Sequence, residues 1–75
     1  MIAIEVESPG NTAEELDRKV VAYLQNGAGE VWVVYPRTNS MLVHSRLDQT
    51  VIRVTGEYQT GLIPGLIVRL QDLLT

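Results

Sequence analysis

The order of apolar segments and turns in this sequence predicts an α+β fold, with a small βαβ unit followed by an antiparallel β-meander. A β-branched segment at 2–7, a capped amphipathic segment at 12–26 and an apolar run at 30–36 follow one another with turns between them. Two more strand-like segments, near 41–46 and 50–55, come after further turn residues. The whole chain, residues 1–75, is expected to form a single domain.

The first segment alternates between two kinds of side chain, as a strand with two different faces does. The even positions are apolar and the odd positions carry two carboxylates: Ile2, Ile4 and Val6 against Ala3, Glu5 and Glu7. Turn residues at 8–11 end the strand.

Thr12 and Glu15 have the spacing of a capping box, which predicts the start of a helix over 12–26. Apolar side chains then recur at helical spacing and form one stripe: Ala13, Leu16, Val20, Tyr23 and Leu24. Asn26-Gly27 predicts the end of the helix, because glycine tolerates the left-handed conformation found there.

The run at 30–36 is too short for a helix and almost wholly apolar, which is typical of a central strand covered on both faces. We expect this strand to lie parallel to the first. The tail after Gly61, Pro64 and Gly65 is ambiguous: its leucines suit either a short strand or a final helical turn.

Composition excludes several function classes. The chain has no cysteine, which excludes disulfides, thiolate nucleophiles and cysteine-ligated zinc. No apolar stretch approaches the roughly 18 residues of a membrane span, and no signal peptide is evident, so we expect a cytoplasmic protein without a membrane partner. A net charge of -3 disfavours a dedicated nucleic-acid-binding module, so nucleic acid is only weakly supported as a partner.

Several short motifs occur in an order that resembles one known family. They are Glu5-Val6-x-Ser8-Pro9, then Lys19, Tyr23 and Gly27, then Glu30 to Val34 with Pro36, and finally Leu62 to Leu66. This order resembles the C-terminal half of the Uma family of putative restriction endonucleases, within the PD-(D/E)XK nuclease superfamily. The resemblance implies a truncated restriction-endonuclease-like core that lacks an N-terminal half.

The resemblance also implies a catalytic site. Glu5 is at the position of the family's metal-binding glutamate, Lys19 at that of its helix-borne lysine, and Glu7 at that of the lysine in the superfamily's standard triplet. The cofactor would be Mg²⁺ if the protein is active, and none otherwise. The metal-binding aspartate has no counterpart, because in the family it lies on an earlier strand, so these residues would be vestigial in an inactive protein.

Each candidate has a simpler structural interpretation. Glu5 and Glu7 can be the solvated face of an edge strand, and Lys19 can extend along its own helix or pair with Glu15. His44 is more typical of a half-buried strand residue than of a ligand, and Trp32 more typical of a core residue than of a base-stacking platform. The scattered arginines at 37, 46 and 53 suit a solvated face.

Two functions remain open at this point. The first is a non-catalytic remnant that acts as a self-associating structural or interaction module. The second is a Mg²⁺-dependent DNA endonuclease whose site is completed across a homo-oligomer. Both include self-association, because the strand at 2–7 is expected to be an edge whose apolar face needs cover, and a homodimer is its simplest form.

Overall fold

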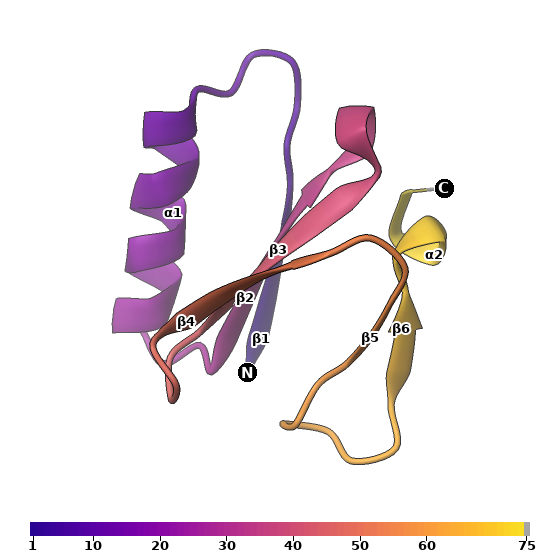
Figure 1. The fold of residues 1–75 in the computed structure, drawn as a ribbon. Helices are drawn as coiled ribbons and strands as arrows, with labels where there is room; N and C mark the ends of the chain where they lie inside the picture. The colour runs from indigo at the N-terminus through magenta and orange to yellow at the C-terminus, as the bar shows by residue number, and fades with distance from the viewer. Residues whose placement is uncertain (75) are drawn as a thin grey trace.

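A four-stranded sheet forms the centre of the protein, with a helix on one face and a small hairpin on the other (Figure 1). The structure is a computed structural model and describes residues 1–74. The sheet contains β1 (Ile2–Val6), β2 (Glu30–Tyr35), β3 (Ser40–Ser45) and β4 (Thr50–Val54). The other elements are α1 (Ala13–Gln25), a 3₁₀ turn (Pro36–Thr38), β5 (Glu57–Gln59), β6 (Ile67–Arg69) and α2 (Leu70–Leu74).

The strand order is β1-β2-β3-β4, so β1 and β4 form the two edges of this sheet. The β1–β2 pair is parallel, with Ile4 beside Trp32 and Glu5 beside Val33. The next two pairs are antiparallel. The predicted βαβ unit and the meander that follows it are therefore confirmed.

Helix α1 has the predicted capping box. The Thr12 side chain accepts a hydrogen bond from the Glu15 amide, and the Glu15 carboxylate accepts one from the Thr12 amide, each at 3.1 Å. Gly27 has a φ of 100°, which confirms the predicted left-handed stop. These two ends fix the length of the helix between β1 and β2.

Two hydrophobic cores lie on opposite faces of the sheet and share β2. The core under α1 consists of Ala3, Leu16, Val20, Ala28, Val31 and Val33. The core under the hairpin and α2 consists of Trp32, Val34, Met41, Val43, Val54 and Leu70. Alternate residues of β2 thus enter opposite cores, and the strand is covered on both sides as predicted.

The hairpin of β5 and β6 is a second, two-stranded antiparallel sheet. Strand β5 was not predicted, because its three residues, Glu57–Gln59, are mostly polar. Both alternatives for the tail are realised in succession, since β6 leads directly into α2. Within residues 1–74, no helix is long and apolar enough to cross a bilayer.

A buried carboxylate ties the hairpin to the main sheet. Glu30, at the start of β2, is buried and accepts hydrogen bonds from Trp32 Nε1 at 2.9 Å, Thr60 Oγ1 at 2.9 Å and Tyr58 Oη at 3.0 Å. Tyr58 also packs edge-on against Trp32, with ring centroids 5.6 Å apart. Because buried polar groups need partners, Glu30 and the two hydroxyl groups hold each other in place.

We expect Glu30→Ala to lower the free energy of unfolding by about 3 kcal/mol, because it leaves buried donors without an acceptor. Urea unfolding followed by Trp32 fluorescence measures this loss. Glu57→Ala is the matched control. The Glu57 side chain is 60% exposed and forms a long, solvent-exposed ion pair with Arg69 at 3.8 Å, so its removal should lower the free energy of unfolding by less than about 1 kcal/mol. Equal losses for the two variants would contradict the anchoring role of Glu30.

Candidate functional site

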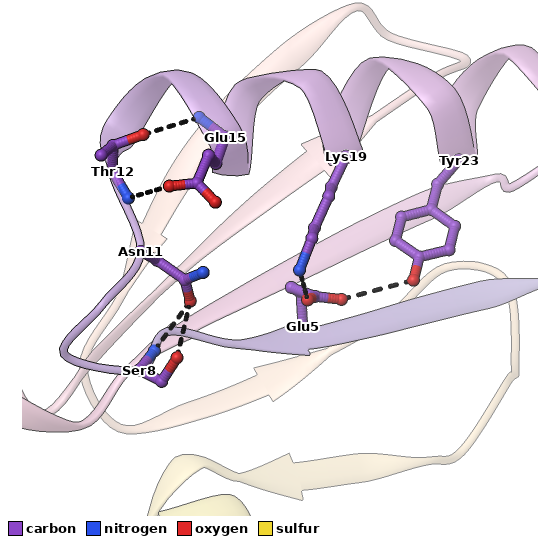
Figure 2. Close-up of polar contacts among 7 residues, drawn as sticks. All are labelled: Glu5, Ser8, Asn11, Thr12, Glu15, Lys19 and Tyr23. Atoms are coloured by element: carbon purple, nitrogen blue, oxygen red, sulfur yellow. Dashed lines mark hydrogen bonds and ion pairs between the residues drawn. The ribbon is translucent and has the colours of Figure 1, made fainter.

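Glu5 of β1 and two side chains of α1 form the main polar cluster on the helix-covered face (Figure 2). Lys19 Nζ lies 2.8 Å from Glu5 Oε1, and Tyr23 Oη donates a hydrogen bond to Glu5 Oε2 at 3.3 Å. Both carboxylate oxygens therefore have a donor. The structure brings Glu5 and Lys19 together, although they are 14 positions apart in the chain.

Strand and helix periodicity explain why these side chains meet. Odd positions of β1 point toward α1, as buried Ala3 shows, so Glu5 points the same way. Lys19 and Tyr23 are four residues apart and lie one above the other on α1. The alternative partner for Lys19, Glu15, instead closes the capping box (Figure 2).

The ion pair is partly open to solvent, with 19% of the Glu5 side chain and 47% of the Lys19 side chain exposed. The hydrogen bond to Glu5, with the charge of that carboxylate, raises the pKa of Lys19 above its ordinary 10.5. Lys19 therefore stays an ammonium group at neutral pH. In this state it is an ion-pair partner and not a proton acceptor.

Glu7, the third residue of the implied site, makes a different contact. Its carboxylate lies 3.6 Å from Arg37 Nη2, in the 3₁₀ turn after β2. Glu5 and Glu7 are thus each matched with a basic side chain from a different element.

Within residues 1–74, Glu5 and Glu7 are paired with basic side chains and are not gathered with other carboxylates around one point. Mg²⁺ requires near-octahedral oxygen coordination and usually binds through one or two carboxylates and several waters. Among residues 1–74, no group of three or more His, Cys, Asp or Glu side chains is placed to hold a metal ion. Both oxygens of Glu5 already accept hydrogen bonds from Lys19 and Tyr23, so a Mg²⁺ ion would have to compete with an ammonium group for this carboxylate.

His44 and Trp32 have the structural roles expected of them. His44 is half-buried on β3, and this burial lowers its pKa. It lines a groove of about 480 Å³ between α1 and β4, beside Val21 and Val51. Trp32 is buried in the core, and the Ser8 hydroxyl bonds Asn11 Oδ1 in the turn before α1.

Several polar contacts were not predicted from the sequence. Tyr23 was assigned to the apolar stripe and to the family motif without a polar contact, yet its hydroxyl group reaches Glu5. Its spacing of four residues from Lys19 was the available indication. The contacts of Glu30 had a weaker indication in the sequence: a lone acidic residue at the start of a buried strand needs polar partners.

The comparisons with known proteins agree with this fold. The model of a family described as Uma2, putative restriction endonuclease, matches residues 1–73. The fold is similar to the crystal structure of a putative nuclease belonging to DUF820 from Anabaena variabilis ATCC 29413, with a TM-score of 0.75 and 18% sequence identity. That similarity covers 97% of this chain and 42% of the other protein, so this chain spans less than half of it. No curated protein matches the chain.

Lys19 is the only lysine of the chain, so its side-chain amine can be titrated without overlap. We expect NMR to give a pKa above 10.5 in the native protein and a value closer to 10.5 in Glu5→Gln. Because folding raises this pKa, the stability from the pair is complete below the unfolded-state pKa and is lost as the pH rises through the folded-state value. Glu14→Gln, on the solvent side of α1, is the control and should leave the titration unchanged. An unchanged pKa in Glu5→Gln would contradict the ion pair.

Proposed function

Because this chain belongs to the Uma2 family of putative restriction endonucleases, we propose that it is a nuclease-like module that is not catalytic by itself. It acts instead as a self-associating structural or interaction module. The observation that carries this proposal is the pairing of Glu5: both of its oxygens are held by donors of α1. A carboxylate held in this way stabilises the packing of α1 on β1, and a cation would have to compete with Lys19 for it.

The charge arrangement supports the same proposal. Phosphodiester hydrolysis by metal ions needs several oxygen ligands around one or two cations, because negative charge develops on the phosphate oxygens. In this chain Glu7 is matched with Arg37. The second carboxylate that a Mg²⁺ site would use is therefore also directed to a basic side chain.

One observation favours a second candidate function, a Mg²⁺-dependent DNA endonuclease whose site is completed across a homo-oligomer. Glu5 and Lys19 are in direct contact at 2.8 Å, so two of the three residues that the family resemblance makes catalytic share one location. The missing oxygen ligands would then have to come from a second copy. Self-association is common to both candidates.

Self-association is supported by the apolar side chains that β1 leaves open. Ile4 is 46% exposed and Val6 is 48% exposed, on the face that carries the hairpin. An edge strand with apolar side chains is a template for pairing with another chain. A domain of this size also buries only about 60% of its unfolded surface, so a partner adds stability that its own core lacks.

We expect no cleavage of supercoiled plasmid by the purified protein with Mg²⁺ or Mn²⁺, and no rise in its melting temperature with either ion. Gel electrophoresis and thermal scanning measure the two effects. The control is Glu5→Gln, which should behave as the native protein does toward both ions. Ion-dependent cleavage that disappears in Glu5→Ala and Lys19→Ala would contradict the first proposal and establish the second.

We expect sedimentation equilibrium at tens of micromolar to give about twice the chain mass of 8.3 kDa. We expect this mass because a second copy would bury the exposed apolar side chains of Ile4 and Val6. A single-chain mass across this concentration range would contradict both candidate functions, since each requires self-association.

A further inference from the structure

The outer edge of β1 carries backbone groups that the main sheet does not use. Met1 O accepts a hydrogen bond from the Gly29 amide, and the Glu7 amide donates one to Val34 O, both at 2.8 Å. The N–H and C=O groups of one strand residue point to the same side, and this side alternates along the strand. Odd positions of β1 thus bond to β2, and even positions direct their backbone groups to the open edge.

The same even positions carry the apolar side chains. Ile2 is partly buried against the core under the hairpin, whereas Ile4 and Val6 are about half exposed. Open backbone groups and open apolar side chains therefore coincide on Ile4 and Val6 of one short strand. A second strand laid along this edge would satisfy both at once.

We propose that β1 pairs antiparallel with β1 of a second copy, about a twofold axis at Ile4. The two four-stranded sheets then form one continuous sheet. This inference rests on the self-association in the proposed function, and it specifies the surface and the register of that association. A twofold axis needs a self-complementary strand, and the alternation of β1 provides one.

The register follows from charge and from the number of backbone partners. With the axis at Ile4, each even residue finds a partner: Ile4 meets the partner's Ile4, and Ile2 meets the partner's Val6. With the axis at Glu5, two like charges would face each other with Cα atoms about 4.5 Å apart, which is destabilising. With the axis at Ala3, the backbone groups of Val6 would remain unpaired.

The opposite edge of the sheet, β4, is less suited to this pairing. Ile52 is 46% exposed, the same fraction as Ile4. However, its neighbour Arg53 is also exposed, whereas the charged side chains of the β1 edge, Glu5 and Glu7, are each paired with a basic side chain of their own copy. An exposed charged side chain on an edge strand opposes pairing with another strand. β1 carries apolar side chains at all of its edge-directed positions, which makes it the better interface.

The proposed register also determines where the two ion pairs lie. Glu5 is opposite the partner's Ala3, and the partner's Glu5 is its diagonal neighbour at about 7–8 Å. Each of these carboxylates keeps its own Lys19, so the charges near the axis are balanced within each copy. Both Glu5–Lys19 pairs then lie on the same face of the joined sheet.

Single-cysteine variants test this register, because the native chain has no cysteine. In Ile4→Cys the two Cα atoms would be about 5.5 Å apart, within the range of a disulfide, so mild oxidation should link most chains into dimers. Val6→Cys is the first control: its two copies would be four residues apart along the strand, about 13 Å, and should not link. Ile52→Cys, with equal exposure on β4, is the second and should also not link.

Disruption of the edge gives an independent measurement. Ile4→Lys places a charge at the axis beside its own copy, and it should shift the sedimenting mass from two chains to one while circular dichroism stays unchanged. Ile52→Lys should leave the two-chain mass in place. Two results would overturn the β1 interface: a disulfide-linked dimer of Ile52→Cys, or a two-chain mass for Ile4→Lys. Either result would leave the proposed self-association in place. A one-chain mass for the native protein would overturn both.

Discussion

The need to cover β2 on both faces organises the rest of the structure. Five of its six residues are buried, and alternate side chains enter different cores. Helix α1 covers one face because Leu16 and Val20 point toward Val31 and Val33. The hairpin and α2 cover the other because the polar group at the start of the strand, Glu30, is bonded by Tyr58 and Thr60. The segments before and after the main sheet's meander thus cover the two faces of one central strand, α1 on one side and the hairpin with α2 on the other.

Periodicity and capping residues were enough to predict the sheet and α1, because their determinants are local. Thr12 and Glu15 specify the start of the helix, and the apolar run after Gly29 specifies the central strand. The hairpin was not predictable in this way. Its strands have three residues each, and what holds β5 is Tyr58 in contact with Trp32 and Glu30, far away in the chain.

The candidate site was predictable only in part, for a related reason. The family resemblance pointed to Glu5 and Lys19, and the structure places them in contact. Neither the residue pattern nor the family resemblance indicated that Tyr23 would donate a hydrogen bond to the second oxygen of Glu5, or that Glu7 would pair with Arg37. Such contacts depend on how a helix lies over a sheet, which a linear pattern does not specify. The outcome is a polar cluster whose charges are balanced by neighbouring side chains.

The Glu30 anchor has a consequence for the order in which the protein folds. Its hydrogen bonds to Tyr58 and Thr60 span 28 and 30 residues, whereas β2, β3 and β4 are joined by short turns. Closing a long loop costs more chain entropy than closing a short one, so the meander can assemble first and the C-terminal segment docks onto it afterwards. On partial unfolding that segment detaches first and uncovers Trp32, which makes the indole ring a reporter of early opening.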